Sequence, residues 1–273
     1  MFSSLMVNAW IAAGCIAVAS GVVGFFVVAR GMSFAAHALP MAAFPGAAAA
    51  ALVGVDPLLG IVVFAGLGAV GIARLEGRHE RHEVATALCL VMLLGVGALL
   101  LSMTRQYSQS VFALLFGAVL GVSRGELAPI AALCAATVAA MALLFRPLLL
   151  DSISPELAKA AGVSTRAVGP AFLCVLALAA AMALPVAGSL LAFSLMVGPA
   201  ATARLLTARP LRALLISAGL SLCIVWAALA LSYLSDWPVG FFVGGLGALC
   251  YGACRAWAAV RGRRGRAAAH VPS

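Results

Sequence analysis

The sequence predicts an all-α polytopic membrane protein with about nine transmembrane helices and one short re-entrant or interfacial helix. Three observations predict this class. Of the 273 residues, 65% are hydrophobic and only 9% are charged, which excludes an ordinary soluble domain. The apolar residues form runs of about 20, the length that crosses a bilayer as a helix. Arginines lie where these runs end, so a membrane surface explains the net charge of +9 better than nucleic acid does.

The first four spans are apolar runs separated by short polar breaks. The first run ends at Arg30, and it lacks the basic start of a cleaved signal, so we expect it to be retained. Asp56 and Pro57 make a turn between the second and third spans. A charged loop, 74–83, separates the third from the fourth. The four ranges are about 8–29, 34–54, 58–73 and 84–103.

The second half of the chain begins with an apolar piece, 111–120, that is too short to cross and is expected to be re-entrant or interfacial. A break at Pro185 separates the sixth span from the seventh. Residues 1–260 therefore form one transmembrane domain, and 261–273 form a basic tail that we expect to be disordered. The last five spans are about 127–150, 167–184, 188–206, 211–234 and 238–257.

The distribution of basic residues predicts the orientation. If 111–120 does not cross, nine crossings place the N-terminus outside and the C-terminus in the cytoplasm. Only Arg105 and Arg124 of the 17 lysines and arginines then lie outside, which leaves 17 − 2 = 15 inside. A crossing at 111–120 would abolish this bias. The nine-span topology therefore places the central polar stretch, 151–166, in the cytoplasm.

This stretch predicts a short, exposed helix between two spans. Residues 154–156 (Ser-Pro-Glu) form an N-cap, a proline at the first helical position and an acid in the first turn. Leu157 and Ala160–Ala161 share one face, and Gly162 ends the helix. Such a helix is suited to binding a partner in the aqueous phase, although an ordinary loop between spans is the alternative.

The charged residues exclude several kinds of chemistry. Ion- and proton-coupled transporters usually keep carboxylates at membrane depth, and here every acid lies in a loop or at the end of a span. Lys159, the only lysine, is followed by alanine, so the chain has no phosphate-binding loop. If this protein pumps, another chain must hydrolyse the nucleotide. The eight acids are Asp56, Glu76, Glu80, Glu83, Glu126, Asp151, Glu156 and Asp236.

The second span holds the polar residues most suggestive of function. His37 is ionisable at membrane depth, and Met41 follows one turn later on the same face. Pro40 and Pro45 interrupt the backbone hydrogen bonds, which frees carbonyls to line a cavity. Imidazole and thioether ligands suit a borderline-soft cation such as zinc. The alternative is that His37 bonds a neighbouring helix and Met41 fills space.

Four weaker candidates remain open. A histidine and glutamate cluster follows the third span and is either a metal-sensing loop or a solvated charged one; its members are His79, Glu80, His82 and Glu83. Cys250 and Cys254 share a helix face as a thiolate pair or as packing residues. Arg204 is either a snorkelling anchor or a lock between helices. Close helix approach, either within one copy of the chain or between two copies, is expected at the glycines of the last span, Gly240, Gly244, Gly245 and Gly247.

Several short motifs together resemble a known family, the permease subunits of ABC-type zinc and manganese importers. The resemblance runs over nearly the whole chain and rests on the order and spacing of the motifs. They are MSF at 32–34, the polar second span ending in PG at 45–46, LFG at 115–117, the 151–162 stretch, GSLL at 188–191, GPAATAR at 198–204 and PVG at 238–240. The family also resembles the cobalamin and siderophore importer permeases in architecture.

The resemblance implies a transporter subunit and not an enzyme, a multi-pass protein of the bacterial plasma membrane that imports a divalent metal. It implies a homodimer whose members each dock on a separate cytoplasmic ATPase, while an extracytoplasmic metal-binding protein delivers the ion. No cofactor is expected on this chain. The implied coupling residues are Ser154, Pro155, Glu156, Leu157, Ala158 and Gly162.

The chain departs from the family in the second span. Family members typically carry an acid and a histidine four residues apart, and here those positions hold His37 and Met41. Loss of the carboxylate argues against manganese, which favours oxygen ligands, and the imidazole fits zinc. Met41 is a poor zinc ligand, so a two-residue site of His37 and Met41 is the weaker part of the hypothesis.

Two rival classes stay open. An intramembrane enzyme would need a second ionisable partner for His37, and the chain offers none at membrane depth. The other is an importer of manganese, a chelated metal or an organic cofactor on the same architecture.

Overall fold

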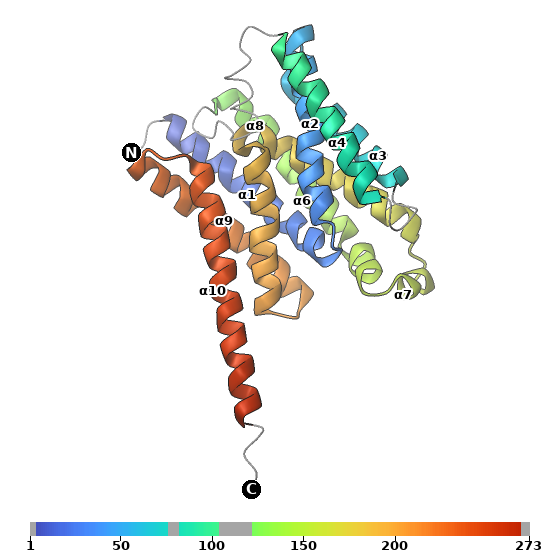
Figure 1. The fold of residues 1–273 in the computed structure, drawn as a ribbon, viewed down its shortest axis with the longest axis vertical. Coiled ribbons are helices and arrows are strands. Elements are labelled where there is room, and N and C mark those ends of the chain that lie inside the picture. The colour runs from blue at the N-terminus through green and yellow to red at the C-terminus, as the bar shows by residue number, and fades with distance from the viewer. Residues whose placement is uncertain (1–3, 76–81, 104–121, 269–273) are drawn as a thin grey trace.

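The computed structural model describes residues 4–75, 82–103 and 122–268, and this part of the chain is helical with short connections (Figure 1). The predicted short helix at 111–120 and the loop residues His79 and Glu80 lie outside it. The helices are α1 (Ser4–Ala29), α2 (Ser33–Val53), α3 (Pro57–Leu75), α4 (His82–Ser102), α6 (Arg124–Ile153), α7 (Pro155–Ala160), α8 (Thr165–Leu206), α9 (Pro210–Ser235) and α10 (Val239–Ala268).

The predicted polytopic class is confirmed. Within the described ranges, 8 helical segments are long and apolar enough to cross a membrane, and two of them are the halves of α8. The remaining predicted span coincides with α4, where the described apolar segment Leu90–Leu100 is shorter. The helices also run past the predicted boundaries, and α6 begins three residues early at Arg124 because Ser123 and Glu126 form a capping box there.

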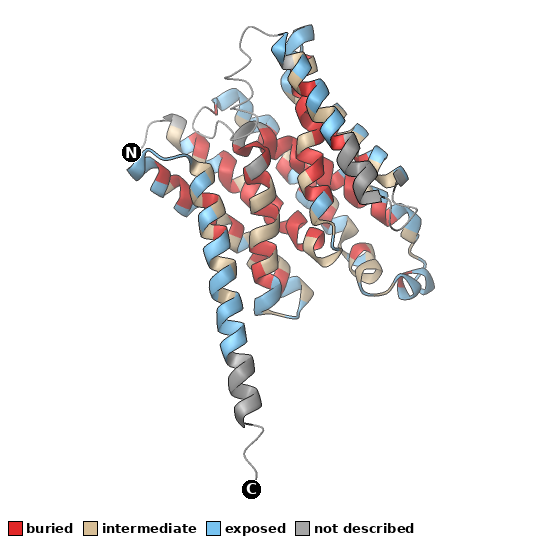
Figure 2. Ribbon diagram, in the orientation of Figure 1, coloured by how far each residue is buried: buried red, intermediate tan, exposed pale blue. Residues whose placement is uncertain are grey.

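The core is built by α1 and the first half of α8, whose residues are mostly buried. The long helix α8 packs against α1, α2, α3, α6, α9 and α10. Buried residues gather in the middle of the bundle, whereas most of α10 up to residue 260 is exposed or half-buried (Figure 2). The outward faces of α3, α9 and α10 carry large apolar side chains, as expected of surfaces in contact with lipid.

The break in α8 lies three residues after the predicted one. Gly188 has φ 74° and ψ 166°, so the helical conformation is interrupted there, near the junction of the two candidate spans 165–184 and 187–206. Pro185 was the predicted breakpoint. The turn occurs at Gly188 because a residue without a Cβ adopts positive φ at no steric cost.

Glycines bring three pairs of helices into backbone contact, one of them α1 and α9, where a Cβ at Gly21 would overlap the Ala218 backbone. Gly46 of α2 and Gly60 of α3 face each other so closely that a methyl group on either would overlap the other's backbone. A Cβ at Gly24 of α1 would likewise overlap the backbone of Met196 in α8. In membranes such contacts replace the hydrophobic effect as a source of helix association.

The basic tail departs from the expected disorder. Helix α10 continues to Ala268, eight residues past Val260, where the apolar span ends. Arginine and alanine are both strong helix formers, so the helix begun in the membrane is propagated into the basic segment. Residues 269–273 lie outside the described part of the chain.

Candidate functional site

The candidate metal residue His37 lies one turn into α2. This helix starts at Ser33, after a tight turn at Gly31, and runs without a break to Val53 through both Pro40 and Pro45. The two prolines are buried. The predicted disruption is therefore confined to individual backbone hydrogen bonds and does not unwind the helix.

His37 is half-buried and contacts α8. Its imidazole lies edge-on against the ring of Phe193, with 5.1 Å between the ring centroids. Phe193 in turn lines a groove of about 370 Å³ between the second half of α8 and α10. The groove also holds the hydroxyl-bearing residues Ser194 and Tyr251. His37 does not line this groove itself but contacts Phe193, which does.

Met41 has different neighbours. It packs against the small apolar cluster formed by Ala38, Ala42 and Leu90, together with α3 and α4 side chains. His37 therefore contacts α8, whereas Met41 packs toward α3 and α4. The helical spacing keeps the two residues one turn apart, but they do not converge on a shared neighbour. In the described ranges no group of three or more His, Cys, Asp and Glu side chains is placed to hold a metal ion.

Three of the described carboxylates have local structural roles at helix ends. Asp56 Oδ1 accepts a hydrogen bond of 2.8 Å from the Leu58 backbone at the start of α3. Glu126 closes the capping box of α6. Asp236 ends α9 in the left-handed conformation, with φ 58°. These placements agree with the expectation that the acids lie at span ends.

The predicted exposed helix of the central stretch is confirmed as α7. Ser154 is its N-cap, and its Oγ accepts a 3.3 Å hydrogen bond from the Leu157 backbone N–H. Pro155 opens the helix and Glu156 lies in its first turn, as predicted. Gly162 ends it with φ 78°. Ser154 is also the C-cap of α6, so no flexible linker separates the two helices.

Most of α7 projects from the bundle. Ala158 is fully buried and seats the helix, whereas Leu157 and the preceding Ile153 expose 52% and 67% of their surface. Pro155 and Glu156 are exposed as well. Two large apolar side chains at the end of a span, beside an acid, are suited to contact with a protein partner.

We expect Ser154→Ala to loosen α7. Losing an N-cap costs about 1 kcal/mol, which corresponds to about fivefold faster hydrogen exchange of the α7 amides. Ser164→Ala is the matched control, because Ser164 is the N-cap residue of α8 and makes no side-chain capping bond. Hydrogen exchange followed by mass spectrometry measures both. Equal exchange of α7 in Ser154→Ala and the wild type would show that the cap does not hold this helix.

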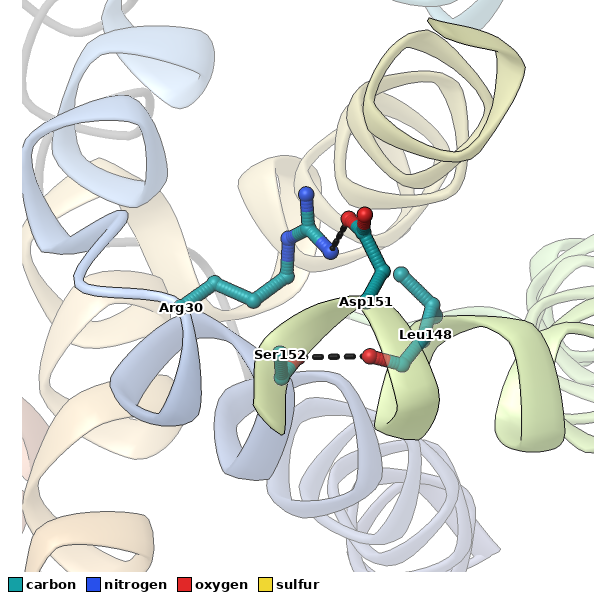
Figure 3. A network of polar contacts seen from close by, with 4 residues as sticks. All are labelled: Arg30, Leu148, Asp151 and Ser152. Atoms are coloured by element: carbon teal, nitrogen blue, oxygen red, sulfur yellow. Dashed lines mark hydrogen bonds and ion pairs between the residues drawn. The ribbon is translucent and has the colours of Figure 1, made fainter. Parts of the chain in front are cut away.

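A polar cluster that was not foreseen joins the ends of α1 and α6 (Figure 3). Arg30 Nη1 donates a 2.7 Å hydrogen bond to Asp151 Oδ2, and the two side chains are only 14% and 9% exposed. The guanidinium also lies over the ring of Phe172, 5.9 Å from its centroid. The sequence shows a basic residue after the first span and an acidic residue after the fifth. Nothing in it predicts that these two residues, 121 positions apart, are in contact.

Arg204 acts as a lock between helices. Its Nη1 donates a 2.9 Å hydrogen bond to the Val28 carbonyl near the end of α1. That carbonyl belongs to the last turn of the helix, where carbonyls lack intrahelical partners. The end of α1 is thus held from two sides. Asp151 of α6 pairs with Arg30, and Arg204 of α8 donates to the Val28 carbonyl.

The other sequence candidates show no gathered site. Cys250 and Cys254 are half-buried free thiols. Gly240 packs against Leu191, but a Cβ at Gly244, Gly245 or Gly247 would meet nothing within 4 Å. The predicted close approach therefore holds within this chain only at Gly240. The closest glycine contacts lie instead in α1, α2 and α3.

Comparison with known proteins gives a consistent family match. The profile of the ABC 3 transport family matches residues 3–251. The manganese import system permease protein ScaB of Streptococcus parasanguinis is 30% identical over 199 residues, which cover 72% of this chain and 71% of that protein. The high-affinity zinc uptake system membrane protein ZnuB of Haemophilus influenzae is 27% identical over 183 residues, covering 66% and 70%.

The fold has a close counterpart among solved structures. The structure of PsaBC from Streptococcus pneumoniae in complex with Fab matches with a TM-score of 0.84 and 25% sequence identity. The match covers 92% of this chain and 91% of that chain.

Proposed function

Because the chain belongs to the ABC 3 transport family, we propose that it is the membrane permease of an ATP-driven importer of a divalent metal ion, with zinc as its cargo. The observation that carries this proposal is α7, a capped and exposed helix between two spans, on a chain that has no phosphate-binding loop. Energy must then enter from another subunit, and α7 offers a surface to receive it.

The ATPase is proposed to bind α7 in the cytoplasm. Leu157 and Ile153 supply exposed apolar contact, and Glu156 supplies a charge beside them. Ser154 and Pro155 pre-organise the helix, so less conformational entropy is lost when the ATPase binds. Ala158 anchors the helix to the bundle, and Gly162 turns the chain back into α8.

The proposed orientation has the N-terminus outside and the C-terminus in the cytoplasm. It rests on the excess of basic residues on one side. The contacts of Arg30 with Asp151 and of Arg204 with Val28 agree with it, because they gather the ends of α1, α6 and α8 at the same end of the bundle as α7. Each of these ends was assigned to the cytoplasmic side.

The donor chemistry favours zinc over manganese. His37 provides an imidazole, and no carboxylate accompanies it on α2. Zinc accepts nitrogen ligands readily, whereas manganese favours oxygen. Manganese remains the second candidate, because ScaB is named for manganese import. A chelated metal or an organic cofactor is the third.

A second copy of this chain is proposed as the other half of the pathway. The groove beside Phe193 is lined by α8 and α10 and is otherwise open, and most of the described side chains of α10 are exposed or half-buried. One imidazole is too few ligands for zinc, which takes four. Two copies would supply two imidazoles, and an extracytoplasmic metal-binding protein would deliver the ion.

The test is reconstitution of the whole importer. The tagged chain should co-purify with an ATPase, and vesicles containing both with the binding protein should accumulate zinc only when ATP is supplied. Zinc should compete with radioactive manganese for uptake more strongly than manganese competes with zinc. If no ATPase co-purified, the proposal of an ATP-driven importer would be contradicted. If manganese competed more strongly than zinc, only the assignment of zinc as the cargo would be contradicted.

A further inference from the structure

We propose that Arg30 and Asp151 are positioning residues that transmit movement of α7 to α2, the helix that carries His37. This inference rests on the proposed function. It assigns a role to a largely buried ion pair, 14% and 9% exposed, that the sequence does not indicate and that lies close to α7 and to the start of α2.

The first step of the argument is the position of Asp151. It lies in the last turn of α6, three residues before Ser154, which caps both α6 and α7. The Ser154 N–H donates to the Leu150 carbonyl, and Ser152 Oγ donates to the Leu148 carbonyl, at 3.0 and 2.6 Å. The end of α6 is thus rigid, so a displacement of α7 moves the Asp151 carboxylate with it.

The second step is the position of Arg30. It lies at the tight turn from α1 to α2, where the Met32 N–H donates to the Val27 carbonyl at 2.9 Å and the Gly31 N–H donates to Val28 at 3.4 Å. Gly31 has φ 69°, and together these features form a Schellman motif. Helix α2 begins at Ser33, so no slack separates Arg30 from the first turn of α2.

The third step is that a contribution to folding stability does not by itself explain the Arg30–Asp151 ion pair. A buried ion pair recovers its desolvation cost only when the remaining donors are also satisfied. Arg30 Nε is buried and has no hydrogen-bond partner among the described residues. The guanidinium is instead held in place by Asp151 and by the face of Phe172, which is fully buried in α8. The geometry favours a directional link between α6, α1 and α8.

The path is continuous. It runs from α7 through the shared cap Ser154 to Asp151, across the 2.7 Å contact to Arg30, and through the turn to α2. Apart from this turn, α2 packs mainly on α3, α4 and α8 and only slightly on α1. The ion pair is therefore a short route from α7 to the first turn of α2 that does not pass through the packing of α2 on α8.

The experiment replaces the pair by apolar residues of similar volume. Arg30→Met/Asp151→Leu removes the polar link without leaving a buried charge, which often restores stability lost in the single variants. We expect the double variant to assemble with the ATPase as the wild type does and to hydrolyse ATP. Metal accumulated per ATP should fall about fivefold or more, in the range of typical coupling between sites. The probes are zinc and manganese ions in vesicles containing the complete importer.

The control is Arg146→Met, which removes an exposed cation from the same helix α6. It should leave metal accumulated per ATP unchanged. If the double variant assembles poorly, Arg30→Lys serves in its place, because it keeps the charge balance but shortens the link, and it should also lower the ratio. An unchanged ratio in the assembled variant would overturn the inference alone. A wild-type importer without ATP-driven uptake would overturn the proposed function and this inference with it.

Discussion

Zinc uptake is expected to be abolished when His37 is replaced by alanine, while assembly with the ATPase is retained. Among the candidate spans that the structure describes, His37 is the one histidine, and it contacts Phe193, which lines the groove between α8 and α10. Removing a residue that merely orients a metal ligand costs about 10–100-fold, and loss of the imidazole itself should cost no less. The measurements are growth at limiting zinc and uptake of radioactive zinc, in a strain whose own zinc importers are deleted.

Met41→Leu is the matched control on the same helix. Leucine conserves the volume that packs against Ala42 and Leu90 and removes only the sulfur. Because Met41 packs toward α3 and α4, we expect uptake within about twofold of the wild type. Normal growth of His37→Ala would remove His37 from the route. A loss in Met41→Leu as deep as that in His37→Ala would instead make Met41 a ligand.

The second large effect is expected from Gly60→Val, which should prevent α2 and α3 from packing. A Cβ at Gly60 would overlap the backbone of Gly46, and backbone cannot move aside as a flexible side chain can. Overpacking typically lowers the free energy of unfolding by about 1–3 kcal/mol. Because the Gly46 backbone cannot move aside, we expect a loss of about 3 kcal/mol or more. The measurements are the yield of monodisperse protein in detergent and its thermal unfolding midpoint.

Gly66→Val serves as the control because it lies on the same helix. A Cβ at Gly66 would meet nothing within 4 Å, so the added side chain faces open space. Its yield and unfolding midpoint should equal those of the wild type or exceed them, since valine is a better helix former than glycine. Similar behaviour of the two variants would show that the α2–α3 contact does not depend on these glycines.

The features that could be predicted from the sequence are local ones. Runs of apolar residues predict the membrane spans. Ser154, Pro155 and Gly162 predict α7, because each is favoured at one position near the start or end of a helix. The prediction that His37 and Met41 share a site also used a local rule, the spacing of i and i+4. That rule does not identify the neighbouring helices, and the structure gives the two residues different ones.

The features that could not be predicted depend on which helix faces meet. Close helix approach was expected at the glycines of α10, where an added Cβ at Gly244, Gly245 or Gly247 would meet nothing within 4 Å, whereas Gly46 and Gly60 were not predicted to make such a contact. The pairing of Arg30 with Asp151 joins residues 121 positions apart. The break in α8 occurs at Gly188 and not at Pro185, because the turn requires positive φ.

The sequence by itself determined that this chain crosses a membrane many times, the approximate position of most of its spans, and that a capped helix is exposed between two of them. Only the tertiary structure decided that α1 and the first half of α8 form the core and that Arg30 meets Asp151. The physical reason is the solvent. Lipid tails are as apolar as the helices, so hydrophobicity determines that a helix enters the membrane but does not distinguish its buried face from its lipid-facing one. Close packing and a few polar contacts make that choice, and they join residues far apart in the chain.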